Sequence, residues 1–349
     1  MTWLTFRQFR VQAITALAAL AVLAVAYGTT GGHLAHLYDA SGLRGCGGQP
    51  GCLSRVTTFI DAMKADQFYP VLFFAGILIL VILPAIIGAF WGAPLVAREL
   101  ETGTYRLAWN QDVTRSRWMA VKLAGVGLAA IATTGAASLL FSWWAAPINA
   151  AGGFPDNFSQ FVRMTPLMFA AQGADPVAWA AVAFVIGVVA GILVRRTIAA
   201  MAITIVVVAA LQVLWPSYVR PHLLTPDRAT APITAVSLNS MLVSNHNAVT
   251  VAINQPGTAR LPGAWIVADQ SLTPSGKQFF LPGTPGSLCA HGSPQQCQDW
   301  IASHHLTQVV DYLPASSFWR LQGIEAALLL AIAAGLGAVA TWRVRRLLT

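Results

Sequence analysis

The sequence predicts an all-α polytopic membrane protein. We expect six transmembrane helices, cytoplasmic N and C termini, and a small external segment, mostly irregular with some β-structure, before the last span. The chain is 56% hydrophobic and only 10% charged, unlike a soluble globular protein. Its apolar runs also reach or approach the roughly 20 residues that a helix needs to cross a bilayer.

The first apolar run, Val11–Tyr27, follows a lead-in of alternating aromatic and basic residues. Such a lead-in is typical of a segment that lies at the level of the lipid headgroups. Residues Ala24–Ala26 also have the small-x-small pattern of a signal-peptide cleavage site, which is the alternative. We expect the run to be retained as a span. A polar, Gly-rich segment, residues 28–69, follows it.

The second span, Pro70–Val96, carries no charge and is long enough to cross with some tilt. Pro84 is expected to kink it, because proline removes a helix hydrogen bond. Gly88 and Gly92 form a GxxxG motif, which would allow another helix to approach closely.

The third span runs from about Trp118 to Trp144, with Thr114 or Asp112 as the candidate N-cap. A Pro-containing external loop, residues 145–176, comes next. Within it we expect a short surface helix at Phe158–Ala171.

Spans four and five are Val177–Val194 and Thr197–Trp215. Gly187 and Gly191 give the fourth span a second GxxxG motif. Because just two arginines separate the spans, they are expected to form a hairpin that turns at the cytoplasmic face.

A polar, Pro-rich stretch of about a hundred residues precedes the last span, which is about Leu321–Trp342. The sequence thus divides into 1–215 with five spans, an external segment 216–316, and 317–349 with the sixth span and a basic tail. Within the external segment, β-branched residues predict strands at Ala248–Ile253, Ala264–Ala268 and Thr307–Tyr312.

The distribution of positive charge sets the orientation. Twelve of the 21 Lys and Arg residues lie in or next to four short polar segments, against nine in the much longer remaining ones. Positive residues mark the cytoplasmic side of a membrane protein. We therefore place the short segments and both termini in the cytoplasm of a bacterial cell, with the chain in its plasma membrane.

All four cysteines fall in segments that the charges place outside. Short separations favour two bridges within loops, Cys46 with Cys52 and Cys289 with Cys297, in an oxidising compartment. The alternative is a metal site, because three histidines lie near the second pair. Their spacing matches no standard zinc pattern, so we expect no metal.

The spans contain few charges that could couple transport to an ion gradient. Apart from Lys122, near the cytoplasmic end of span three, Glu325 is the charged residue within the predicted cores. We expect its carboxyl to reach the interface and pair with Arg320; the alternative is a role in gating or in the substrate path. None of the three lysines ends a P-loop, so the chain is not expected to be an enzyme.

The most basic passage between two apolar runs is residues 97–122, with five of the 21 Lys and Arg. Apolar residues recur among these charges, as expected of a short helix on a surface. We interpret the passage as a cytoplasmic coupling helix, with Glu101 to Thr104 at its start, on which a soluble protein pushes. Its candidate coupling residues are Glu99, Glu101, Thr102, Gly103, Thr104, Tyr105 and Arg106.

This passage resembles permeases of the type-2 ABC exporter family, especially the actinobacterial branch. The resemblance rests on Ala97–Trp109, on Gly191–Thr197 and on Phe318–Glu325, together with the order of the spans. By the family pattern Glu101, Gly103 and Thr104 occupy an acidic-x-Gly-Thr element that docks on an ATPase, and Glu325 matches an acidic position. The external segment is longer than the hairpin of simpler members.

The resemblance implies a permease that dimerises, most simply as a homodimer, and binds two copies of a separate ABC ATPase. It would export a drug-like, antibiotic or lipid-like molecule, with ATP and Mg²⁺ bound by the partner and no cofactor by this chain. Two alternatives remain: a membrane-anchored sensor or assembly protein acting through residues 216–316, and an ion-coupled carrier using Glu325. The soluble segments contain no basic stripe with interleaved aromatic residues, so we expect no nucleic-acid partner.

Overall fold

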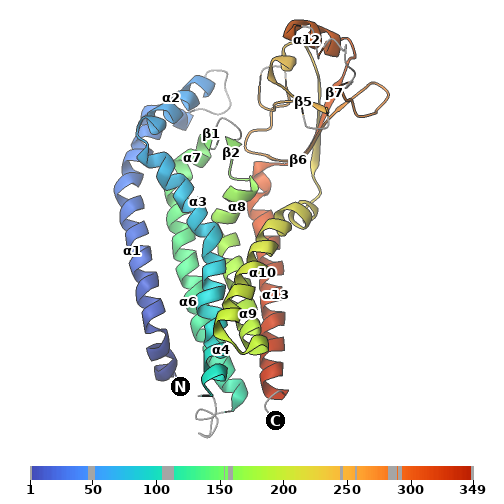
Figure 1. The fold of residues 1–349 in the computed structure, drawn as a ribbon. Coiled ribbons are helices and arrows are strands. Elements are labelled where there is room, and N and C mark those ends of the chain that lie inside the picture. Colours follow the sequence, from blue (N-terminus) through green and yellow to red (C-terminus); the bar gives the residue numbers. More distant parts are fainter. Residues whose placement is uncertain are drawn as a thin grey trace. The chain divides into compact units, whose positions relative to one another are not determined.

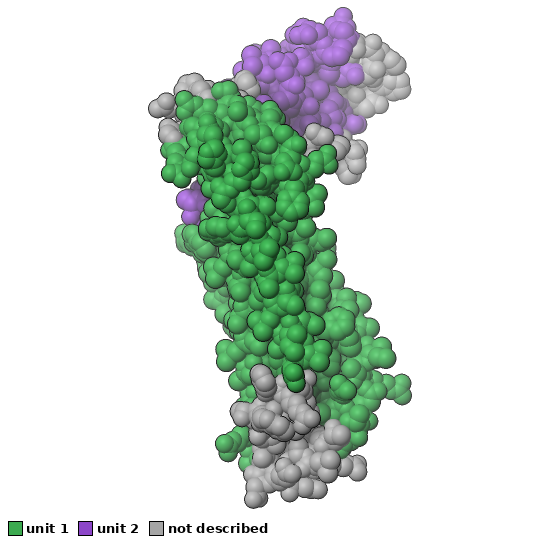
Figure 2. Space-filling view, turned by 90° about the vertical axis from the view of Figure 1, so that its left-hand side faces the viewer, with its two compact units in different colours: residues 1–223, 319–349 green, residues 224–318 purple. Residues whose placement is uncertain are grey.

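The computed structural model describes residues 2–45, 52–103, 114–152, 154–155, 160–243, 247–255, 258–281, 289 and 293–346. The chain forms two compact units, 1–223 with 319–349 and 224–318 (Figure 2). Within the described ranges, six helices are long and apolar enough to cross a membrane, as predicted.

The first unit is helical (Figure 1). The ends of α1 and α13 that carry the chain termini lie at the same end of it, as does the end of α4 that leads into residue 103. Its helices are α1 (Thr2–Ala40), α2 (Cys52–Ala65), α3 (Phe68–Ile87), α4 (Ala93–Thr102), α6 (Arg115–Trp144), α7 (Ala146–Ala150), α8 (Pro166–Ala171), α9 (Asp175–Val194), α10 (Thr197–Tyr218) and α13 (Phe318–Arg346).

The second span is interrupted rather than simply kinked. Pro84 lies inside α3, and a π-helical turn, Gly88–Gly92, joins α3 to α4. Proline frees a carbonyl of the preceding turn, and π-helix occurs mostly as single turns inside α-helices. The π turn lets α4 continue as a short amphipathic helix with its own buried face.

Helix α9 is the centre of the bundle. Of the 18 most apolar consecutive residues of this helix, 72% are buried, against 44% for the second span. It packs on α3, the π turn, α4, α6 and α10. Its many alanines and glycines allow this, because small side chains let helix backbones approach.

The two GxxxG motifs pack against each other in the same chain. A Cβ atom added at Gly88 would lie 2.6 Å from the carbonyl oxygen of Ala183, and one added at Gly191 would lie 2.6 Å from that of Ala93. Neither distance allows a side chain. The motifs therefore fix the crossing of α9 with the second span.

Aromatic residues fill the core nearer α2. Tyr27 of α1 lies 5.2 Å from Trp144 between ring centroids, and Phe141 lies close to both. The indole nitrogen of Trp144 donates a 2.9 Å hydrogen bond to the hydroxyl of Thr30. This contact binds α1 to α6 three residues after Tyr27, where the sequence predicted that the first span would end, and α1 itself continues to Ala40.

The helix expected at Phe158–Ala171 begins later and is not on the surface. α8 starts at Pro166, and Met168, Phe169 and Ala171 are buried. The prediction was wrong because the apolar face of this segment packs against α3 and α9.

The second unit is built on an antiparallel sheet of order β3-β7-β6. It also contains a small antiparallel pair, β4-β5, and a helix, α12. Their bounds are β3 (Asp227–Pro232), β4 (Met241–Val243), β5 (Val249–Val251), β6 (Trp265–Leu272), α12 (Pro294–Ala302) and β7 (Thr307–Leu313). β5, β6 and β7 confirm the three predicted strands.

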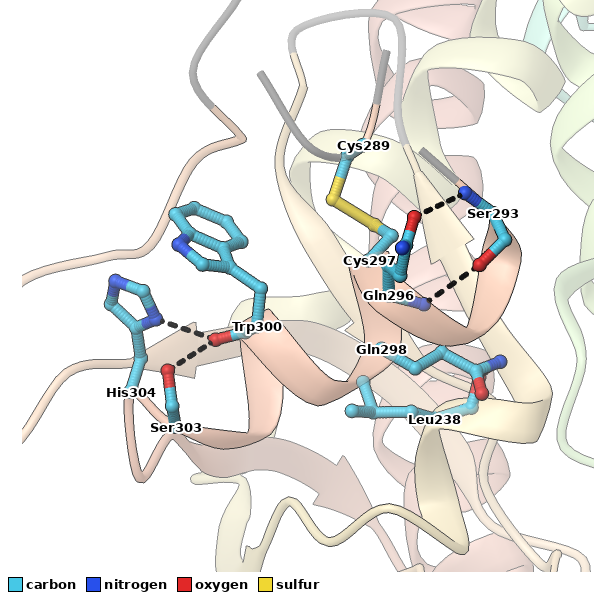
Figure 3. Close-up of a disulfide and its surroundings, with 9 residues drawn as sticks. All are labelled: Leu238, Cys289, Ser293, Gln296, Cys297, Gln298, Trp300, Ser303 and His304. Carbon is cyan, nitrogen blue, oxygen red and sulfur yellow. Dashed lines mark hydrogen bonds between the residues drawn. A yellow bond between two sulfur atoms is a disulfide. The ribbon is translucent and has the colours of Figure 1, made fainter. Parts of the chain in front are cut away.

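A disulfide joins Cys289 to Cys297 of α12, which confirms that pairing (Figure 3). Ser293 and Gln296 form a capping box that stabilises the N-terminus of α12, the helix that carries Cys297. The bridge uses both sulfur atoms that the alternative metal site would need. Cys46 lies outside the described residues, so its pairing with Cys52 stays a prediction.

Candidate functional site

Two acidic residues at the end of α4 attach it to neighbouring spans. Glu99 accepts a 2.5 Å hydrogen bond from Lys122 of α6, whose ammonium also donates to the carbonyl of Leu95 at 3.3 Å. Lys122 is only 3% exposed and lies over the ring of Trp118. A buried lysine needs such partners, because an unpaired ammonium is costly away from water.

Glu101 connects α4 to the start of α10. One oxygen of its carboxylate accepts hydrogen bonds from the backbone nitrogen of Thr197, at 2.9 Å, and from the Thr197 hydroxyl, at 2.7 Å. Thr197 is the first residue of α10. A carboxylate there satisfies a free N–H and faces the positive end of the helix dipole.

The glycine after α4 ends the helix. Gly103 has φ +73°, a left-handed conformation that suits glycine at this position. Thr102 uses its hydroxyl to donate to the carbonyl of Arg98 within α4, at 2.9 Å. Thr104, Tyr105 and Arg106 lie outside the described residues, so their coupling role stays a prediction.

These contacts correct the expected helix start. Glu101 and Thr102 form the last turn of α4, whereas the sequence placed them at the beginning of a short helix. Glu101 does lie at a helix N-terminus, but that helix is α10, 96 residues away in the sequence. We call the contacts of Glu99 with Lys122 and of Glu101 with Thr197 the coupling clamp.

Three charged side chains are buried together at the other end of the helical unit. Arg220 donates to both carboxylate oxygens of Glu325, each at 2.8 Å, and to Asp175 at 3.4 Å. Their side chains are 1%, 0% and 0% exposed, in that order. We call Asp175, Arg220 and Glu325 the outer charge cluster.

Arg220 also binds α8. Its guanidinium donates to the carbonyl of Pro166 at 3.3 Å and lies 4.3 Å from the ring centre of Phe169. Arginine suits this position because its planar fork binds a carboxylate with two hydrogen bonds while its face stacks on an aromatic ring.

The expected partner of Glu325 was wrong. Arg320 is exposed, and Arg220 pairs with Glu325 instead. Arg320 precedes Glu325 by five residues, which puts it on a different face of α13, whereas residues three or four apart share a face. The sequence offered one sign: Arg220 is a basic residue just after an apolar run in a segment expected to be external.

Side chains of α6 and α13 hold the non-helical corner between α8 and α9. Gln322 of α13 accepts from the backbone nitrogen of Ala174 at 2.7 Å and donates to the carbonyl of Gln172 at 2.6 Å. Ser138 of α6 donates to the carbonyl of Gly173 at 2.9 Å. In a membrane, backbone outside a helix must be satisfied within the protein, and these side chains meet that need.

The comparisons with known proteins identify the family. Residues 17–220, more than half of the chain, match the family model described as ABC-2 membrane transporter related. The chain belongs to this family. No curated protein and no solved structure matches it.

Membership in the ABC-2-related family agrees with a multi-pass membrane permease rather than a catalytic subunit. The matched range contains spans two to four, most of the first and fifth spans, the coupling clamp, Asp175 and Arg220. Glu325 and the second unit lie beyond it. The family match therefore covers the clamp fully and the outer charge cluster in part.

Proposed function

We propose that the chain is the permease subunit of an ATP-driven exporter in a bacterial plasma membrane. It would act as a dimer with two copies of a separate ATPase that binds ATP and Mg²⁺. The observation that carries this proposal is the coupling clamp. A polar segment that must receive force needs a rigid attachment, and α4 is fixed to α6 through Glu99 and to α10 through Glu101.

The clamp suggests how force would enter the bundle. The ATPase would contact residues that follow Gly103, where the chain leaves α4 in a left-handed turn. A push there would act on α4, and the two carboxylate contacts would carry it to the third and fifth spans. Glu101 would then act by positioning α10.

The polar groups within the spans favour a weakly polar substrate. Thr133 and Thr134 donate their hydroxyls to carbonyls of their own helix, and Gln212 donates to the carbonyl of Val81. Ser138 and Ser142 are engaged with Gly173. Since these groups already have protein partners, a path along these helices offers a substrate mainly apolar contacts. This agrees with a drug-like, antibiotic or lipid-like molecule.

The test is co-purification of the permease with a co-expressed ABC ATPase, together with ATP hydrolysis by the complex. Gly103→Ala should weaken ATPase binding and Glu101→Gln should reduce substrate-stimulated hydrolysis, while both variants still insert into the membrane. Gly103→Ala forces an alanine into a left-handed turn, at a cost of about 1–2 kcal/mol.

Gly152 provides the matched control. It has a φ of +97°, and a Cβ added to it would meet no other atom. Because Gly152 follows α7 and lies far from the clamp, Gly152→Ala imposes a similar backbone strain elsewhere in the chain. Gly152→Ala should leave ATPase binding and hydrolysis unchanged. Fully coupled complexes from both Gly103→Ala and Glu101→Gln would refute the coupling role of this segment.

A further inference from the structure

The outer charge cluster contains more acid than base. Asp175 and Glu325 contribute two carboxyl groups and Arg220 one guanidinium, and all three are at most 1% exposed. With both carboxyls ionised, the cluster would hold one uncompensated negative charge out of contact with water. Burying such a charge is costly, and a group in that position takes up a proton instead.

The hydrogen bonds show which carboxyl is compensated. Glu325 receives two bonds of 2.8 Å from Arg220, whereas Asp175 receives one of 3.4 Å. The other oxygen of Asp175 is fully buried and has no hydrogen-bond partner among the residues that the structure describes. The carboxyls of Asp175 and Glu325 accept from the same guanidinium nitrogen of Arg220, so they lie close to each other. Two ionised carboxylates so close repel each other, and one proton held between them removes that repulsion.

Among the residues that the structure describes, the elements around the cluster supply no second cation. α8 contributes the carbonyl of Pro166 and the ring of Phe169, and α13 contributes the neutral amide of Gln322 one turn before Glu325. The nearest basic residues in the sequence point elsewhere: His222 is exposed and bonded to the carbonyl of Tyr218, Arg320 is exposed, and Arg163 stacks on Trp319.

We propose that Asp175 and Glu325 together bind one proton at the outer end of the helical unit, and that opening of this end releases it. In the closed form the proton makes the cluster neutral. If water entered between α8 and α13, both carboxyls could ionise. Asp175 would then also face the positive end of α9, in whose first turn it lies.

The proposal predicts an unusual pattern of substitutions. One carboxylate suffices to neutralise Arg220, so Asp175→Asn and Glu325→Gln should each fold and insert. In Glu325→Gln, Asp175 would ionise and replace Glu325 as the partner of Arg220. The double variant leaves Arg220 without an anion, and its yield should fall far more than the two single losses combined.

Infrared spectroscopy of the purified chain in lipid tests the proton directly. At neutral pH the wild type should show the carbonyl stretch of a protonated carboxylic acid, shifted by exchange into D₂O. Both Asp175→Asn and Glu325→Gln should lose this band. Asp269→Asn is the control, because burial raises the pKa of this carboxyl in the second unit; it should leave the cluster's band in place.

A wild type without the band, or a band that survives either single substitution, would overturn the proposal. If Asp175→Asn does not fold, the loss or survival of the carboxylic acid band in Glu325→Gln still tests the proposal. The measurement needs neither an ATPase nor a substrate, so its outcome is independent of the proposed export function. In a reconstituted exporter, transport by the wild type should vary with external pH and transport by Asp175→Asn should not.

Discussion

Replacing Arg220 tests how much the outer charge cluster stabilises the fold. Arg220→Met keeps the length of the side chain but leaves Glu325 buried without its two 2.8 Å hydrogen bonds and the Pro166 carbonyl without a donor. Removing one partner of a buried ion pair costs about 3–5 kcal/mol, because the other group must either stay charged without water or take up a proton. We expect a loss of this size in the free energy of unfolding, measured by reversible denaturation in mixed micelles.

Arg228 is the matched control. It also binds a carboxylate with two hydrogen bonds, those of Asp311 at 2.7 and 3.1 Å, but its side chain is 67% exposed. An exposed ion pair is well solvated and contributes little to stability, so Arg228→Met should change the free energy of unfolding little. Adding Glu325→Met to Arg220→Met should recover most of the loss, since it removes the stranded charge. Equal losses for Arg220→Met and Arg228→Met, or no recovery in the double variant, would refute the reasoning.

Three further predictions concern packing, pH and orientation. Gly191→Ala should destabilise the helical unit by about 1–3 kcal/mol, because its Cβ would meet the Ala93 carbonyl, whereas Gly335→Ala in open space on α13 should be neutral or slightly stabilising; equal effects would contradict the packing. Burial raises the pKa of Asp269 above its ordinary value of 3.8, so the folded state retains this proton more strongly and the second unit should lose stability as pH rises from about 3.8 through the raised pKa. Asp269→Asn should flatten that decline, measured by unfolding across this pH range, and an unchanged slope would exclude Asp269 as its cause. In a background without native cysteines, a membrane-impermeant thiol reagent should label Gly257→Cys but not Gln111→Cys in intact cells, and external labelling of Gln111→Cys would reverse the orientation.

The sequence predicted features that depend on local pattern. Long apolar runs gave the six spans, β-branched runs gave β5, β6 and β7, and the short separation of Cys289 and Cys297 gave their bridge. Each of these depends on residues within about twenty positions of one another, where periodicity and spacing carry the information.

What the sequence did not predict are the contacts between distant residues. Glu325 finds Arg220 across 105 positions, and Glu101 finds Thr197 across 96. The predicted span five ended at Trp215, so Arg220 was assigned to an external segment rather than to the bundle. Asp175, just before the predicted start of span four, was left out for the same reason. Charges at span ends are where such errors occur, because hydropathy fades there although helix packing continues.

The coupling clamp and the outer charge cluster are joined by one helix. α10 starts at Thr197, which binds Glu101, and ends two residues before Arg220, which binds Glu325 and Asp175. Its 22 residues correspond to about 33 Å of α-helix, enough to cross the apolar core of a bilayer. Under the proposed function, a displacement of α4 by an ATPase would pull on the start of α10 and be felt at Arg220. Because a buried ion pair with fixed geometry tolerates little displacement, the cluster would either hold α10 in place or break, and breaking it would admit water to the outer end of the path.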